Sequence, residues 1–353
     1  MVTAMTEFGI NVFRDQIFTV LLLGVWSFIL AMTITPLYTW AAYKYKWWKQ
    51  QRSHALTGEK AVVFSELHRE KHERNIPTMA GLIMVAAITV TTLAFNLSRE
   101  QTYLPLAATL GAGMVGLLDD VINLRGLGRG MAGLSSKLKF LLIFSVATLG
   151  ALFFYYKLGY NGVHLTFIGE RLSEVTIGWT LIPLFVFVVV MTANSVNISD
   201  GLDGLAGGLL VNAFAAYALI AFMQGNYGIA GFCMTIVGAL LAYVWFNIYP
   251  ARFFMGDIGS FALGTALGVV AMLTDTLVLL PVIGLVFVLE GGSSLIQVMS
   301  KRLFGRKLFH VAPIHHHFEA IGWPETKVTM RFWIVGQVVS VVGIILALIG
   351  GHI

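Results

Sequence analysis

The chain has 353 residues, of which 57% are hydrophobic and 12% charged, and its mean hydropathy is +0.80. This composition excludes a water-soluble globular protein, which needs a charged surface. The formal charge is +5, yet no polar stretch remains for a folded basic module, so we expect no nucleic acid partner. The single cysteine, Cys233, excludes an intrachain disulfide. The sequence therefore predicts an integral membrane protein with the lipid bilayer around it.

Apolar windows of about 20 residues, the length that crosses a bilayer, recur along the chain. The first window is too long for the apolar core of a signal peptide, so we expect it to remain as a span. The predicted fold is all-α, one polytopic membrane domain over residues 1–353 with about ten transmembrane helices, at 17–43, 77–97, 102–118, 138–156, 175–197, 202–223, 228–249, 259–274, 276–299 and 331–350.

The positions of Lys and Arg predict the orientation of these spans. Nineteen of the 23 lie in or beside the connections that follow spans 1, 3, 5, 7 and 9. Because positively charged connections stay inside, we expect these connections to be cytoplasmic and both termini to be periplasmic, as in a bacterial inner-membrane protein.

Polar residues that are unusual in such a chain then fall on the cytoplasmic side. They come from four separate connections and predict one active-site cleft between the helices at that face. The set is Asp119, Asp120, Asn194, Asn197, Asp200, Asp203, Asp257, His315, His316 and His317.

The five aspartates in this set predict a metal site. Carboxylates near a membrane are costly, and a hard divalent cation with oxygen ligands compensates them. Mg²⁺ beside a phosphate substrate is the commonest case, with Asp257 as a ligand and Asp200 and Asp203 as further candidates. The alternative is that these residues are solvated turn or helix-capping residues.

The spacing in NSVNISDGLDGLAGG predicts a break in the helix. Asn194, Asn197, Asp200 and Asp203 step by three, so on a straight helix the first and last would face opposite ways. A break near Gly201 would let them converge, and glycine there lets backbone amides approach a phosphate or a base.

Aromatic residues and histidines border the acidic segments. Phe253 and Phe254 precede Asp257 and can pack against a base, although interface anchors are more common. His315, His316 and His317 point about 100° apart on a helix, which disfavours a shared zinc ion and favours hydrogen bonds to phosphate oxygens.

These segments resemble the phospho-N-acetylmuramoyl-pentapeptide transferase family, within the superfamily of polyprenyl-phosphate N-acetylhexosamine-1-phosphate transferases. The resemblance covers PTMAG at 77–81, GLLDD at 116–120, NSVNISDGLDGLA at 194–206, WFNIYPARFFMGDIGS at 245–260 and APIHHHFEAIGWPE at 312–325. It implies ten spans, Mg²⁺, and transfer of phospho-MurNAc-pentapeptide from UDP-MurNAc-pentapeptide to undecaprenyl phosphate, with release of UMP and formation of lipid I for peptidoglycan.

The resemblance also implies roles for individual residues. Asp257 would hold Mg²⁺, Asp119 and Asp120 would act on the lipid phosphate, and Asp200 with Asp203 would serve the nucleotide and metal region. Gly201, Leu202, Asp203 and Phe254 match the uridine pocket, and supporting polar positions are Thr78, Asn194, Asn197, Asn247 and Ser260.

The chain departs from the family pattern at two positions. Glu73 stands where the family usually has a lysine, flanked by Lys71, His72 and Arg74, and Asn123 stands at another lysine position. Lys137 and Lys139 keep the later basic positions. Gly291 and Gly292 after Glu290 predict a bent or broken ninth span that would suit a lipid chain.

Two routes and two rival functions stay open at this stage. The lipid phosphate attacks directly with an aspartate positioning it, or an aspartate forms a covalent intermediate. The rivals are a related transferase that uses UDP-GlcNAc and a cation-coupled transporter, which would place its carboxylates nearer the midplane. A homodimer is an open assembly state.

Overall fold

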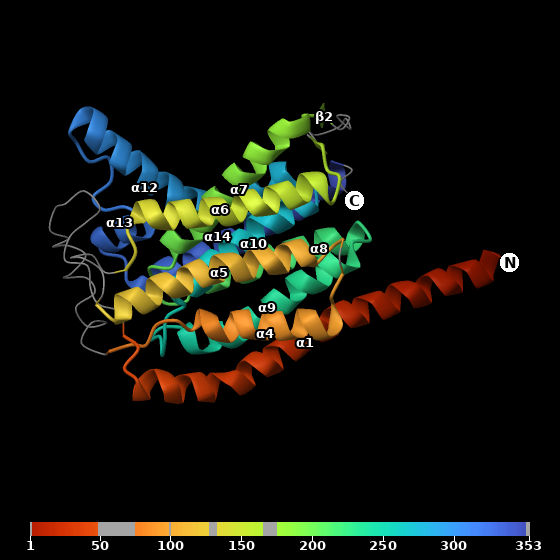
Figure 1. Cartoon of the computed structure of the whole chain (residues 1–353), viewed down its shortest axis with the longest axis horizontal. Helices are drawn as coiled ribbons and strands as arrows, with labels where there is room; N and C mark the ends of the chain where they lie inside the picture. The colour runs from red at the N-terminus through yellow and green to blue at the C-terminus, as the bar shows by residue number, and fades with distance from the viewer. Residues whose placement is uncertain (1, 49–74, 99, 127–132, 165–174, 351–353) are drawn as a thin grey trace.

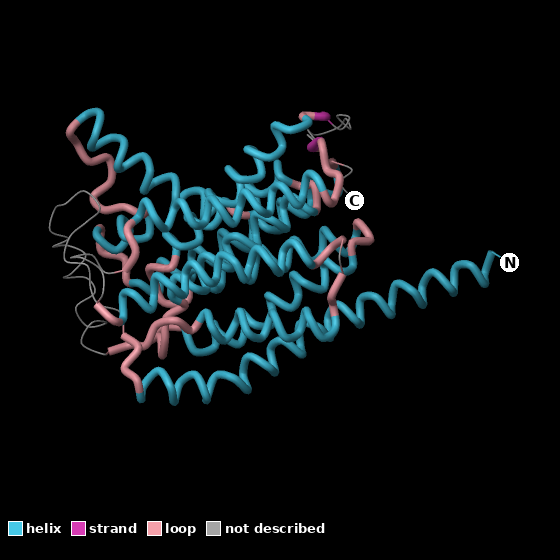
Figure 2. The backbone as a smooth tube through the Cα atoms, viewed as in Figure 1, coloured by secondary structure: helices cyan, strands magenta, loops and turns pink. Residues whose placement is uncertain are grey.

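The computed structural model describes residues 2–48, 75–98, 100–126, 133–164 and 175–350, with side chains from residue 13 onward. Within these residues the chain is a bundle of helices with short connections at its two ends (Figures 1 and 2). The helices are α1 (Val2–Lys44), α4 (Gly81–Phe95), α5 (Tyr103–Leu124), α6 (Ser136–Tyr156), α7 (Leu181–Ser199), α8 (Leu205–Met223), α9 (Tyr227–Asn247), α10 (Gly256–Leu273), α11 (Leu280–Ile283), α12 (Leu285–Phe304), α13 (Ile314–Ala320) and α14 (Glu325–Ile349).

Shorter elements complete the described chain. Two-residue strands β1 (Gly162–Val163) and β2 (Val175–Thr176) pair antiparallel, with Gly162 opposite Thr176. The 3₁₀ turns η1 (Gly178–Thr180) and η2 (Leu277–Leu279) precede α7 and α11.

Helices occupy all ten predicted positions, so the prediction of an all-α, polytopic membrane fold is confirmed. Eight of the described helices are long and apolar enough to cross a membrane, and the bent pair η2–α11 and α12 makes a ninth. The tenth, α4, has only 15 residues. Both chain ends lie at the end of the bundle away from α13, as an even number of crossings requires (Figure 1).

The ninth predicted span is bent, but its glycine pair is not the cause. The bend of 82° lies at Gly284, between α11 and α12, whereas α12 continues through Gly291 and Gly292. A Cβ on Gly291 would lie 2.4 Å from the Ser195 hydroxyl of α7, so this glycine serves helix packing.

Helix α10 is the centre of the bundle. All its residues are buried, and α4, α5, α7 and α8 pack around it. By contrast, α1, α6 and α14 bury less than a third of their apolar windows, as expected of helices that face lipid. The core therefore consists of α10 and the helices that pack directly against it.

The closest approach brings α5 onto the first turn of α10. A Cβ on Gly116 would lie 2.2 Å from the Asp257 carbonyl oxygen, a separation that only glycine permits. Asp119 and Asp120 follow Gly116 by three and four residues, so they lie on the same face of α5, one turn further along. This contact therefore sets the two aspartates beside the start of α10.

We expect Gly116→Ala to lower the unfolding temperature in detergent, because overpacking a tight contact costs about 1–3 kcal/mol. Gly113→Ala is the matched control on the same helix, since its added Cβ would lie 3.4 Å from Ala262, at ordinary contact distance. Equal unfolding temperatures for the two variants, followed by thermal scanning, would contradict the close contact.

Candidate active site

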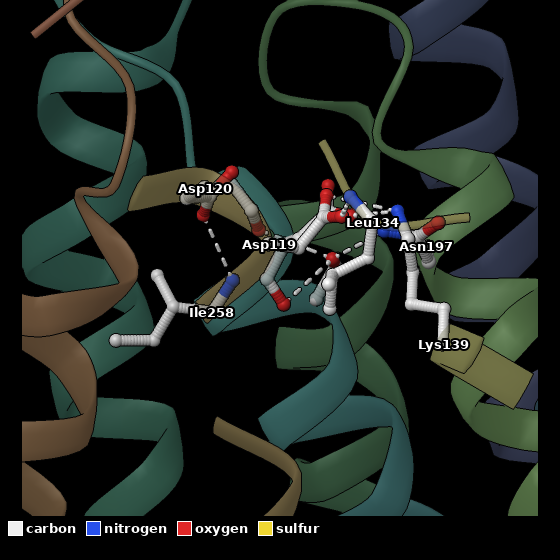
Figure 3. A network of polar contacts seen from close by, with 9 residues as sticks. Asp119, Asp120, Leu134, Lys139, Asn197 and Ile258 are labelled. Carbon is white, nitrogen blue, oxygen red and sulfur yellow. Dashed lines mark hydrogen bonds and ion pairs between the residues drawn. The ribbon is translucent and has the colours of Figure 1, made fainter. Parts of the chain in front are cut away.

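Three buried carboxylates meet where α5 ends and α10 begins. Asp119, Asp120 and Asp257 each offer an oxygen that lies within 4.8 Å of the others. Asp119 and Asp120 come from α5 (Figure 3) and Asp257 from α10, two helices that are far apart in the sequence but in direct contact in space. Because carboxylate oxygens are the preferred ligands of hard cations, this group fits a divalent metal ion.

Lys139 joins two of these carboxylates. Its ammonium nitrogen lies 2.9 Å from Asp119 Oδ2 and 2.7 Å from Asp257 Oδ2, and its side chain is 14% exposed. It sits in the first turn of α6, and Ser135 caps the start of this helix, where its hydroxyl accepts from the Leu138 amide. The start of α6 therefore carries a cation into the acidic group and reduces its repulsion.

Backbone amides hold two further carboxylate oxygens. The Leu134 amide donates to Asp119 Oδ1 at 2.6 Å, and the Ile258 amide donates to Asp120 Oδ2 at 3.1 Å (Figure 3). Ile258 belongs to the first turn of α10, where free amides and the helix dipole favour a negative charge. Gly256 has φ of +76°, and a Cβ there would lie 2.6 Å from Asp120 Oδ2.

A second polar group links the turn after α7 to the turn before α10. The Asn197 amide donates to the Ser260 hydroxyl at 2.8 Å, within α10. Asn247 accepts from the Gly204 amide and donates to the Phe253 carbonyl, both at 2.9 Å. Asp203 accepts from the Ala251 amide at 2.9 Å. These side chains fix the two turns to each other.

The histidine segment packs against the turn after α7. His315 is fully buried, and its Nδ1 lies 2.7 Å from Glu290 Oε2 of α12. Its Nε2 lies so close to the Gly201 backbone that a Cβ on Gly201 would be 2.4 Å from it. The predicted proximity of histidine and turn is therefore observed. Glycine at 201 is what allows the imidazole to rest on the backbone.

The three imidazoles have separate partners, in line with their angular spacing. His316 Nδ1 lies 2.7 Å from Glu319 Oε2, whereas His317 stacks on His310 and accepts its amide hydrogen. Burial, and next the neighbouring His315, lower the pKa of His316 to about 4, against the raising effect of Glu319. His316 is therefore neutral at pH 7.

The remaining predicted site residues lie around these groups. Thr78 is buried and its carbonyl accepts from the Tyr38 hydroxyl at 2.6 Å, while Asn194 bonds to Val190 within α7. Leu202 is buried and Asp200 caps α7.

The two phenylalanines before Asp257 differ in burial. Phe254 is partly exposed, whereas Phe253 is fully buried against Tyr38 and Phe246 and belongs to the core, not to a base pocket. Asp200 and Asp203 are not members of the three-carboxylate group, so their role as metal ligands stays a prediction. Glu73 and its neighbours lie outside the described residues.

Sequence reasoning passed over three charged residues of the site. Glu290 was noted only for the glycines that follow it, although a lone carboxylate in an apolar span is itself a signal of function. Lys139 was noted only as a basic position, because nothing local shows that the start of α6 reaches the carboxylates across 118 residues. Glu325, whose Oε1 accepts from the Asp203 amide at 2.6 Å, gave no signal.

Comparison with known proteins places this geometry in a family. Residues 102–275 match the family described as Glycosyl transferase family 4. A phospho-N-acetylmuramoyl-pentapeptide-transferase of Chloroflexus aurantiacus is 42% identical over 289 residues, 78% of each chain. Those of Geobacillus kaustophilus (39%; 90% of this chain and 94% of the relative) and Desulfotalea psychrophila (36%; 95% and 94%) match over nearly the full length. The chain therefore belongs to the phospho-N-acetylmuramoyl-pentapeptide-transferase family.

Proposed function

We propose that the chain transfers phospho-MurNAc-pentapeptide from UDP-MurNAc-pentapeptide to undecaprenyl phosphate, releasing UMP and forming lipid I. A P–O bond forms between the lipid phosphate and the phosphorus that carries the sugar, and the bond from that phosphorus to UMP breaks. The observation that carries the proposal is the buried group of Asp119, Asp120 and Asp257 with Lys139, in a chain of this family. Phosphoryl transfer needs alignment and charge neutralisation, which such a group supplies.

Mg²⁺ is the metal ion that we propose for this group. Asp257, with Asp119 and Asp120, would hold it through carboxylate oxygens. When bound, Mg²⁺ neutralises and orients diphosphate oxygens and stabilises the leaving UMP. Lys139, from a third helix, bridges Asp119 and Asp257 and holds the two carboxylates at a fixed separation.

The hydrogen bonds of Asp119 favour direct attack by the lipid phosphate over a covalent intermediate on this residue. Both its oxygens accept hydrogen bonds, one from the Leu134 amide and one from Lys139. A carboxylate engaged in this way is held in position, and fewer of its lone pairs are available to attack phosphorus. The role that we assign to Asp119 is therefore to align the lipid phosphate.

His315 and the turn after α7 form the nucleotide side of the proposed site. The imidazole rests on Gly201, and Leu202 and Asp203 follow directly. Glu290 fixes the His315 ring through Nδ1, which leaves Nε2 directed at this turn. Phe254, partly exposed beside the same turns, supplies an aromatic face for uridine.

We also infer that the 353 residues act as one domain in the bacterial inner membrane, with the site at the cytoplasmic face. The three carboxylates and the histidine segment lie at the end of the bundle where α1 ends and α6 begins, and the described turns there carry Lys44, Lys137 and Lys139 (Figure 1). A carboxylate site at one end of the bundle also argues against a transporter.

The function is tested by measuring UMP release by the purified chain with undecaprenyl phosphate and either UDP-MurNAc-pentapeptide or UDP-GlcNAc. We expect UMP only from the first donor, its loss on adding a chelator, and its return with excess Mg²⁺. Strong turnover of UDP-GlcNAc and none of the muramoyl donor would overturn the substrate assignment. Turnover that survives chelation would overturn the assignment of a metal ion to the site.

Asp257→Asn is expected to lower UMP release by about 10²–10³-fold or more, because it removes a charge that holds both Lys139 and the metal ion. Asp275→Asn is the matched control, since Asp275 lies beyond the other end of α10 and contacts His164. Both variants should keep their helical circular-dichroism spectrum. Wild-type turnover in Asp257→Asn would remove this residue from the site.

The lowered pKa of His316 predicts a loss of stability in acid. Its pKa is about 4 in the folded protein, against the ordinary histidine value of 6.5 in the unfolded chain, so the unfolded chain binds the proton first as the pH falls. Stability is full above pH 6.5 and decreases between about pH 6.5 and 4, by up to about 3 kcal/mol from this group.

His316→Gln should flatten this part of the pH profile of the unfolding temperature, whereas His310→Gln, at an exposed position, should not. Thermal scans from about pH 7.5 to about pH 4.5 measure the effect. A wild-type profile in His316→Gln would assign the acid sensitivity to other groups.

A further inference from the structure

The outer end of α12 carries a surface that the proposed reaction does not use. After the 82° bend, α12 leaves the bundle and extends to the upper left in Figure 1. We call residues 299–308 the α12 tip. Its apolar side chains are exposed: Leu303 is 67%, Phe304 70% and Leu308 62% exposed.

Cations alternate with these apolar side chains. The α12 tip contains Lys301, Arg302, Arg306 and Lys307, and no Asp or Glu occurs in the sequence between Glu290 and Glu319. Arg302, Arg306 and Lys307 are exposed. Exposed leucine and phenylalanine beside several Lys and Arg residues is the composition of segments that lie in the headgroup region of anionic membranes.

The α12 tip is ordered by its own hydrogen bonds. Gly305 ends α12 in the left-handed region at φ of +65°, and the Ser300 hydroxyl donates to the Arg306 carbonyl at 2.9 Å. Gln297 accepts from the Leu308 and Phe309 amides at 3.0 Å each and donates to the Phe309 carbonyl at 2.9 Å. These bonds fasten the chain that follows Gly305 back onto α12. The exposed side chains of the α12 tip are therefore held on an ordered backbone.

The two faces of α12 show how the α12 tip meets the membrane. Glu290, Ser293 and Gln297 lie on one face and bond to the returning chain and to the histidine segment. The other face exposes apolar side chains, and these are Val288, Leu289, Leu295, Ile296 and Met299. An apolar face that ends in cations matches a helix whose end reaches the polar headgroups, where Lys and Arg side chains extend to the phosphates.

We propose that the α12 tip is a docking surface for anionic phospholipid headgroups at the membrane surface beside the active site. The charge is complementary to such a surface, and the exposed apolar side chains enter the region of the acyl chains. Each cation near an anionic leaflet strengthens binding by about fivefold at low ionic strength. Because α12 also carries Glu290, the headgroups would hold the helix that orients His315.

The test uses the full chain with an environment-sensitive fluorophore on Leu303→Cys. The native cysteine, Cys233, is buried, so labelling is confined to the α12 tip. We expect the emission in nanodiscs of phosphatidylcholine with one third phosphatidylglycerol to be shifted to the blue of that in phosphatidylcholine alone. The shift should shrink in about 0.5 M salt, which screens charges beyond a few ångströms.

Charge variants separate headgroup recognition from simple apolar insertion. Adding Arg302→Gln and Arg306→Gln should raise the phosphatidylglycerol content needed for the half-maximal shift by at least about fivefold. The matched control, Arg14→Gln with Lys157→Gln, removes the same charge at the other end of the bundle and should leave it unchanged. UMP release in detergent should be wild-type in both, which shows that the proposed function and fold persist.

Three results would overturn the proposal. The emission could be the same in both lipid mixtures, which would make the α12 tip a solvent-exposed or purely apolar element. The shift could survive the Arg302 and Arg306 substitutions. It could appear only when a few per cent of undecaprenyl phosphate is added to phosphatidylcholine, which would make the α12 tip an entry point for the substrate and not a phospholipid site.

Discussion

The requirement to hold three carboxylates within 4.8 Å of one another, inside the end of an apolar bundle, governs the rest of the structure. Like charges at this distance repel, and burial adds a desolvation cost, so the group persists only where the protein compensates it. The compensation comes from three directions: the Lys139 ammonium from α6, the Leu134 amide before it, and the Ile258 amide at the start of α10. The divalent cation that we propose for this group would add to this compensation.

The packing of the bundle follows from this requirement. The α10 helix must begin where α5 ends, and Gly116 permits it by letting the Asp257 carbonyl come against the α5 backbone. Gly256 then turns the chain into α10 with a positive φ, close enough to Asp120 for the Ile258 amide to reach it. Small residues and a buried central helix are therefore as much a part of the site as the acidic side chains are.

Hydropathy and charge predicted the spans and the shared end of the polar residues, because both depend on composition over long windows. The sequence could not show which aspartates meet. Asp203 looks equivalent to Asp257 in sequence, yet its carboxylate accepts the Ala251 amide and its own amide donates to Glu325, contacts that form only in the folded chain. The bend in the ninth span was likewise expected at Gly291 and Gly292, but it lies at Gly284. A glycine that allows close helix packing and a glycine that ends a helix cannot be told apart in the sequence.

The bend between α11 and α12 solves a further problem of burial. Glu290 lies in an apolar stretch, and on a straight continuation of α11 it would need a polar partner within the membrane. Beyond the bend, α12 instead turns Glu290 toward His315, while Ser293 and Gln297 fasten the chain that carries the histidines. The position of the His315 imidazole on Gly201 thus depends on the angle of α12. Because the other face and the outer end of α12 meet lipid, this one helix connects the lipid around the protein to the geometry of the site.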